Sequence, residues 1–157
     1  MILVSSCLAG MKVRYNGTDR LDEHICQLVE AKKAVMVCPE LLGGFQTPRP
    51  PAEIIGGTGE DVLDGRAKVM DQLGRDVTDM YVAGAMQTLQ TASEVGATMV
   101  VLKENSPSCG SSEIYNGAFS GEKIAGAGVT TALLRRNGMT VLSEEEFSAK
   151  QAEKRHT

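Results

Sequence analysis

Several features that would place this chain of 157 residues in a special class are missing from its sequence. It has no apolar stretch near the roughly 20 residues that a membrane span requires, and its first residues, MILVSSC, contain no basic leader. It has no internal repeat and no low-complexity tract. These absences favour one soluble domain, which at this length buries roughly 70% of the surface of the unfolded chain.

Cysteine is scarce and widely spaced. The four cysteines stand at positions 7, 26, 38 and 109, without the dense spacing of a small secreted scaffold and without a Cys-x-x-Cys pair. We therefore expect reduced thiols and a cytoplasmic protein. The formal net charge of -4 argues against binding of polymeric nucleic acid, because such binding neutralises many phosphates with Lys and Arg. A small ligand is the partner that this charge favours.

Apolar runs of strand length alternate with helical patterns along most of the chain, which indicates parallel βαβ units. The expected strands are residues 1–4, 34–37, 98–103 and 139–142. Three helices are expected. The first starts near Thr18 or Asp19, the second runs from Asp76 or Thr78 to Val95, and the third runs from Val129 to Arg136. The predicted fold is a three-layer α/β domain over residues 1–147, with a mainly parallel β-sheet, helices on both faces, and a C-terminal tail at 148–157.

Other local signals complete the prediction. Asp76 or Thr78 is expected to cap the long helix, and Ser143 with Glu146 forms a capping box for a short C-terminal helix. Glycine and proline in residues 43–51 predict a rigid loop. Residues 53–71 fit a β-hairpin or an irregular flap.

Three of the cysteines share one position relative to the predicted strands. Cys7, Cys38 and Cys109 each follow a strand within a few residues. The carboxyl ends of parallel strands lie along one edge of the sheet, where ligands bind, so residues far apart in sequence can meet there. Cys26 falls inside the first helix next to Ile25, and we interpret it as a buried structural residue.

Three thiolates at one site could hold a zinc ion with one water or a 4Fe-4S cluster with one open iron, and their spacing does not choose between the two. An open iron is a soft Lewis acid that suits a thiocarbonyl sulfur and polarises its C=S bond for attack by water. That attack needs a general base and a group that orients water. Glu40 and Ser106 are placed for these roles, although a solvated loop carboxylate and a turn residue are the alternative interpretations.

Four ordered segments carry a resemblance to a known family. They read SSCLAGMKVRYNG, CPELLGGFQTPRPPAE, LKENSPSCG and GAGVTTALLRRNGMTVLSE. This pattern closely resembles the family once known as domain of unknown function 523, whose characterised members are thiouracil desulfidases. The resemblance implies a 4Fe-4S cluster on the cysteines that match Cys7, Cys38 and Cys109, with a glutamate and a serine that assist. We assign those two roles to Glu40 and Ser106.

The same resemblance implies an enzyme that replaces the sulfur of thiouracil, or of a thiouridine nucleoside or nucleotide, with oxygen from water. Hydrogen sulfide is released without net redox change, by a hydrolase or lyase type of C–S bond cleavage. Some members carry one more cysteine where this chain has Val13, so the open iron is favoured here. The alternatives are a non-catalytic iron-sulfur or zinc sensor and a zinc hydrolase.

Further polar residues stand in the same loops as the candidate ligands. Arg14, Tyr15, Arg49 and Glu53 could orient a pyrimidine by stacking, hydrogen bonding or pairing with a phosphate. Ser108 is a further candidate for contact with the substrate. Alternatively, Arg49 pairs with Glu53 and braces the proline loop. The glycines of residues 126–128 either offer backbone amides to an anion or pack the following helix closely.

Overall fold

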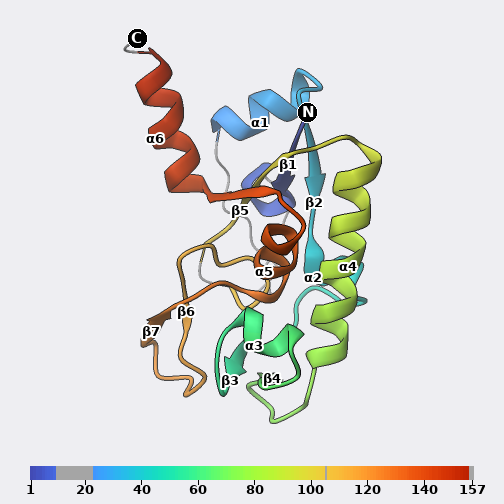
Figure 1. Ribbon diagram of the computed structural model, residues 1–157, viewed down its shortest axis with the longest axis vertical. Helices are drawn as coiled ribbons and strands as arrows, with labels where there is room; N and C mark the ends of the chain where they lie inside the picture. The colour runs from blue at the N-terminus through green and yellow to red at the C-terminus, as the bar shows by residue number, and fades with distance from the viewer. Residues whose placement is uncertain (10–22, 105, 156–157) are drawn as a thin grey trace.

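A four-stranded parallel sheet forms the centre of the protein (Figure 1). The computed structural model describes residues 1–9, 23–104 and 106–155, with the backbone alone at residues 9 and 151–155. The strands of the central sheet are β1 (Ile2–Ser5), β2 (Ala34–Val37), β5 (Met99–Leu102) and β8 (Thr140–Ser143). Their order is β2-β1-β5-β8, and each neighbouring pair is parallel. All four strands coincide with predicted apolar runs.

Helices cover both faces of this sheet. They are α1 (Glu23–Glu30), α4 (Thr78–Glu94), α5 (Val129–Arg136) and α6 (Glu144–Arg155). Ile25 of α1 and Phe147 of α6 cluster with Val4 on one face, and Leu134 of α5 clusters with Leu3 on the other. Successive residues of a strand point to opposite faces, so this division follows directly from the apolar run. The predicted three-layer α/β fold is confirmed.

The helix ends agree with the predictions in part. Ser143 N donates to Glu146 Oε1 and Glu146 N donates to Ser143 Oγ, both at 3.1 Å, so the predicted capping box is confirmed. Helix α6 continues to Arg155, through most of the segment predicted as a tail, and the domain boundary at 147 stays a prediction. Val77 holds the N-cap position of α4, but the predicted Asp76 does satisfy a backbone amide there, since its Oδ1 accepts a hydrogen bond from Thr78 N at 2.9 Å. No helix of the described segments has both the length and the apolar character that membrane crossing demands.

Smaller elements lie beyond the carboxyl edge of the sheet. They are the 3₁₀ turn η1 (Ser6–Ala9), α2 (Pro39–Leu42), β3 (Ala52–Ile55), α3 (Gly59–Leu63), β4 (Lys68–Asp71), β6 (Glu113–Tyr115) and β7 (Lys123–Ala125). Strands β3 and β4 pair antiparallel, so the hairpin interpretation of residues 53–71 is confirmed, with α3 between the strands. The antiparallel pair of β6 and β7 was not predicted.

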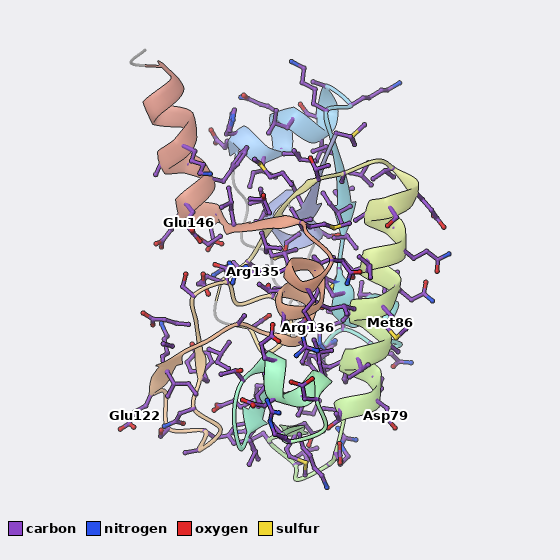
Figure 2. The ribbon with its side chains drawn as sticks, in the orientation of Figure 1. Asp79, Met86, Glu122, Arg135, Arg136 and Glu146 are labelled. Atoms are coloured by element: carbon purple, nitrogen blue, oxygen red, sulfur yellow. The ribbon has the colours of Figure 1, made fainter. Side chains whose placement is uncertain are left out.

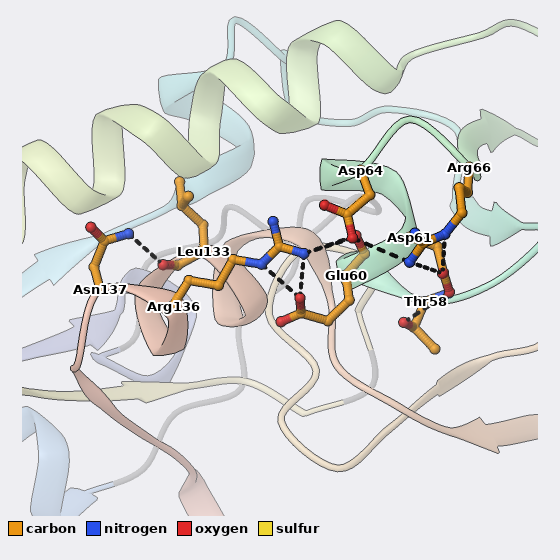
Figure 3. Close-up of polar contacts among 8 residues, drawn as sticks. All are labelled: Thr58, Glu60, Asp61, Asp64, Arg66, Leu133, Arg136 and Asn137. Carbon is orange, nitrogen blue, oxygen red and sulfur yellow. Dashed lines mark hydrogen bonds and ion pairs between the residues drawn. The ribbon is translucent and has the colours of Figure 1, made fainter.

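Helix α3 is fixed to α5 by charge and by close packing (Figure 3). Arg136 donates from Nε to Glu60 Oε2 at 2.7 Å and from Nη2 to Asp64 Oδ2 at 3.0 Å. A Cβ atom at Gly59 would stand 2.3 Å from the carbonyl carbon of Gly128, so the two backbones touch at the start of α5. The β3–α3–β4 unit is thereby attached to the helix that follows the loop of Cys109.

Candidate functional site

A cavity of about 470 Å³ lies at the carboxyl edge of the central sheet. Its walls include Ser6 and Cys7 after β1, Cys38 after β2, and Lys103 after β5. Strands β2, β1 and β5 are neighbours in the sheet, so three adjacent strand ends lead into one cavity. This edge is where open α/β sheets bind their ligands.

Cys7, Cys38 and Cys109 all line this cavity. Cys7 lies in the turn η1, Cys38 is the N-cap of α2, and Cys109 lies in the loop before α5. None of the four cysteines forms a disulfide. Cys26 lies on α1 and is half-buried, not buried as predicted, with its Sγ 3.9 Å from Glu30 Oε1. Three cysteines from distant parts of the chain thus line one cavity, while their role as ligands stays a prediction.

The protonation of these thiols depends on their burial. Burial raises the pKa of the Cys109 thiol well above its ordinary value, and the Glu40 carboxylate raises it further, against hydrogen bonds from Ser108 and Ser106 that lower it. Burial and then Glu40 also raise the pKa of Cys38. Coordination to a metal reverses this preference, because a coordinating thiol is deprotonated outright.

The donor set suits a soft metal centre, since cysteine sulfur favours zinc, copper(I) and iron-sulfur clusters. Within residues 1–9, 23–104 and 106–155, no three His, Cys, Asp or Glu side chains come close enough to hold a single metal ion. A cubane cluster requires a different arrangement of ligands. Each cysteine binds its own iron, so the thiolates stand further apart than around a single metal ion. A cavity of this size accepts a drug-sized ligand, so the three cysteines and their cavity fit a cluster together with a small substrate.

Glu40 and Arg49 form a buried ion pair on the cavity wall. Arg49 Nη2 lies 2.5 Å from Glu40 Oε2, and the two side chains are 6% and 15% exposed. Nη1 of Arg49 also donates to Gln46 O and to Thr47 Oγ1, both at 3.3 Å. Arg49 braces the proline loop as one interpretation expected, but that interpretation named the wrong partner, since the pair forms with Glu40 and not with Glu53. Contact of Arg49 with a substrate stays a prediction.

The two candidate serines have different surroundings. Ser106 lines the cavity, and its Oγ accepts a hydrogen bond from Cys109 N at 2.7 Å. Ser108 is 1% exposed, and its Oγ lies 2.7 Å from Thr130 Oγ1 of α5. Ser106 is therefore the serine that faces the cavity, and a substrate contact of Ser108 stays a prediction.

The start of α5 uses its backbone amides within the protein. Val129 N donates to Pro107 O at 2.8 Å, and Thr130 N donates to Ser108 O at 2.9 Å. A Cβ atom at Gly128 would stand 2.5 Å from the carbonyl carbon of Ser108. The anion-binding interpretation of these glycines is therefore wrong and the packing interpretation is right, because the amides hold the loop that carries Cys109.

Glu104 organises the same loop, a role that was not predicted from the sequence. Its Oε1 accepts hydrogen bonds from Ser111 N at 2.8 Å and Ser112 N at 3.2 Å. Arg135 of α5 donates to Ser111 O at 2.8 Å, and Ser111 Oγ lies 3.1 Å from Glu146 Oε1 of α6; Figure 2 labels both of these charged residues. The one signal for Glu104 in the sequence is its place directly after a buried strand.

Aromatic side chains complete the wall of the cavity. Tyr81, Tyr115 and Phe119 all line it, and none of them was predicted. Tyr81 meets Phe45 edge to face, with 5.0 Å between the ring centroids. Burial, followed by the charge of Glu40, raises the pKa of the Tyr81 hydroxyl well above its ordinary value, so this group keeps its proton. Arg14 and Tyr15, the other predicted contacts, lie outside the described residues.

Comparisons with known proteins show the family of this chain. The model of a family described as 2-thiouracil desulfurase matches residues 2–146. The uncharacterized protein YbbK of Bacillus subtilis strain 168 is 63% identical over 148 residues, which cover 94% of this chain and 98% of YbbK. Among solved structures, the 4Fe-4S-dependent thiouracil desulfidase TudS (DUF523Vcz) matches with a TM-score of 0.84 at 40% identity, over 99% of this chain and 98% of that one.

Proposed function

This chain belongs to the 2-thiouracil desulfurase family, and on that premise we propose that it is an enzyme that removes sulfur from a thiolated pyrimidine with the help of a 4Fe-4S cluster. The observation that carries the proposal is the meeting of Cys7, Cys38 and Cys109 at one cavity. The similarity to a 4Fe-4S-dependent thiouracil desulfidase supports the same cofactor. We also propose a cytoplasmic location, where the thiols stay reduced.

The three cysteines are the residues that would hold the cluster. When bound, it supplies an iron with an open coordination position, which is a soft Lewis acid for a thiocarbonyl sulfur. The residues of the chain then have three tasks: to seat the pyrimidine, to place a water molecule at its thiocarbonyl carbon, and to move protons.

The proposed reaction exchanges sulfur for oxygen and needs no oxidant or reductant. The oxygen of water bonds to the ring carbon, and the C–S bond breaks. Sulfur leaves with the two protons of that water as hydrogen sulfide, and the oxo base remains. Thiouracil and the thiouridine nucleosides or nucleotides share the thiocarbonyl group that this exchange requires.

Glu40 takes the proton from the attacking water in this proposal. Its contact with Arg49 uses Oε2 and fixes the carboxylate at the cavity wall, so Oε1 is the oxygen that takes the proton. Arg49 is therefore a positioning residue for the base. Ser106 orients the water or the ring from the opposite loop. Its Oγ accepts a hydrogen bond from the backbone N–H of Cys109, a proposed cluster ligand, so the two residues keep a fixed relative position.

The test is a substrate panel under nitrogen with reconstituted protein, read out as iron per chain and as sulfide released. We expect brown protein that releases sulfide from at least one thiolated base, nucleoside or monophosphate. Glu40→Gln should keep its iron and lose about 100-fold or more in rate. Cys38→Ser should lose iron, and Cys26→Ser is the matched control that keeps it. Colourless zinc protein, or cluster-loaded protein inactive on the whole panel, would contradict the proposal.

A further inference from the structure

Glu53 is a buried carboxylate on the cavity wall to which the proposed reaction gives no task. It belongs to β3, is 8% exposed, and lines the cavity together with Glu40 and Phe119. Glutamate is almost never buried unless it is paired. The partners of both carboxylate oxygens therefore need an account.

One oxygen of Glu53 has a structural task. Its Oε1 accepts hydrogen bonds from Gly117 N at 2.9 Å and from Phe119 N at 3.3 Å. Gly117 has a φ of +93°, and a Cβ atom there would stand 2.6 Å from Ile54 O, so the loop between β6 and β7 lies directly on β3. Phe119 adopts a φ of +53°, which is unfavourable for a residue with a side chain. Oε1 thus holds Phe119 at the cavity wall against local strain.

The second oxygen has a different environment. Both hydrogen bonds that Glu53 makes with described residues fall on Oε1. Oε2 thus belongs to a buried side chain on the cavity wall and can only accept. Oε2 is not sealed from the cavity, since His24 Nε2 is the only side-chain nitrogen or oxygen of the described residues that is both fully buried and without a partner. A ligand that covers Oε2 without donating to it costs about 1–3 kcal/mol, so a ligand that brings an N–H to this wall is selected over one that does not.

We propose that Oε2 of Glu53 accepts the N3–H of the pyrimidine ring and so serves as the residue that recognises the base. This inference rests on the proposed function. N3 lies between C2 and C4 of the ring, so its N–H is next to the thiocarbonyl carbon whether sulfur sits at C2 or at C4. A nucleoside keeps this N–H, because its sugar occupies N1. Glu53 therefore selects for the base and not for the presence of a sugar.

Glu53→Gln tests this assignment because it separates the two oxygens. The amide oxygen of Gln can still accept from Gly117 and Phe119, whereas its NH₂ group puts a donor where Oε2 faced the N3–H. We expect an unchanged melting temperature and about 10- to 100-fold weaker binding of thiouracil and of its product uracil. The matched control is Glu113→Gln, on the exposed face of β6, which should bind both ligands as the wild type does.

Binding is measured by calorimetry on anaerobic, cluster-loaded protein, and kcat/KM by sulfide release. The wild type should discriminate against N3-methylated thiouracil by about 10-fold or more, and Glu53→Gln should lose that discrimination. Equal use of the N3-methylated and unmethylated bases by the wild type overturns the inference, even if the variant does not fold. Uracil binding by Glu53→Gln at wild-type strength also overturns it. The proposed function fails separately, if the wild type releases no sulfide from any substrate.

Discussion

Replacing Gly84 with alanine is expected to push α2 away from α4 and so to displace the residues of α2 that line the cavity. The two helices touch backbone to backbone, because a Cβ atom at Gly84 would stand 2.1 Å from Pro39 O and 3.2 Å from Gly43 N. Helix α2 follows Cys38 directly and carries Glu40, so its displacement moves a candidate ligand and the candidate base together.

Two effects of opposite sign decide how much the free energy of unfolding changes in Gly84→Ala. Alanine is favoured over glycine inside a helix by about 1 kcal/mol, which would stabilise the variant. Against this, the distance between the new Cβ atom and Pro39 O must increase by about 1 Å to reach 3.0 Å, the shortest distance that Cβ atoms in proteins normally show. Overpacking of this kind costs about 1–3 kcal/mol, and more where the obstacle is backbone. We expect a net loss of about 1–2 kcal/mol, or about 3–8 °C in melting temperature.

The assay combines thermal unfolding with iron content per chain after anaerobic reconstitution. Gly84→Ala should lower both values. The control is Ala83→Gly on the exposed side of the same helix, which should lose about 0.5–1 kcal/mol of stability and keep its iron. A Gly84→Ala protein with full iron content and an equal or higher melting temperature would refute the argument from close packing.

Two further predictions concern stability. Lys32 lies two residues after the end of α1, is exposed and has a φ of 59°, while Lys33 N donates to Leu28 O. Lys32→Gly should therefore raise the free energy of unfolding by about 0.5–1 kcal/mol in urea, and a decrease would contradict this. Burial alone would raise the pKa of the Asp71 carboxyl, but hydrogen bonds from Arg75 and Leu73 lower it overall. Its stabilisation is thus present above the unfolded pKa of about 3.9 and is lost as pH falls through the lower folded value. Asp71→Asn should accordingly cost about 1–3 kcal/mol at pH 7 and much less near pH 2, and a difference independent of pH would oppose this explanation.

The central sheet could be predicted because its strands are continuous apolar runs. Leu3 and Val4 are both buried, each on its own face, and a strand covered on both sides needs no polar alternation. The same argument placed Cys7 and Cys38 at one edge, since Cys38 directly follows β2 and Cys7 stands two residues after the end of β1. The place of Cys109 at this edge does not follow from strand adjacency alone, because Cys109 lies seven positions after the end of β5 at Leu102.

Strands β6 and β7 and the contacts of Glu53 and Glu104 could not be predicted, because they depend on residues that lie far apart in the chain. Strand β7 (Lys123–Ala125) is exposed at every position, so it shows no apolar pattern. Glu53 and Glu104 act on backbone amides far along the chain, and a carboxylate that binds amides has no signature in its own neighbourhood. The choice between Glu40 and Glu53 as partner of Arg49 likewise depends on how the proline loop folds.

The place of β5 in the sheet determines when the site can exist during synthesis. Strand β5 lies between β1 and β8, with Met99 opposite Ile2 on one side and Thr140 on the other. A chain emerging from the ribosome therefore presents Cys7 and Cys38 long before Cys109 has been translated, and the strand that completes the scaffold comes later still. On the proposed ligand set, the cluster can therefore be completed only after residue 109 has been synthesised.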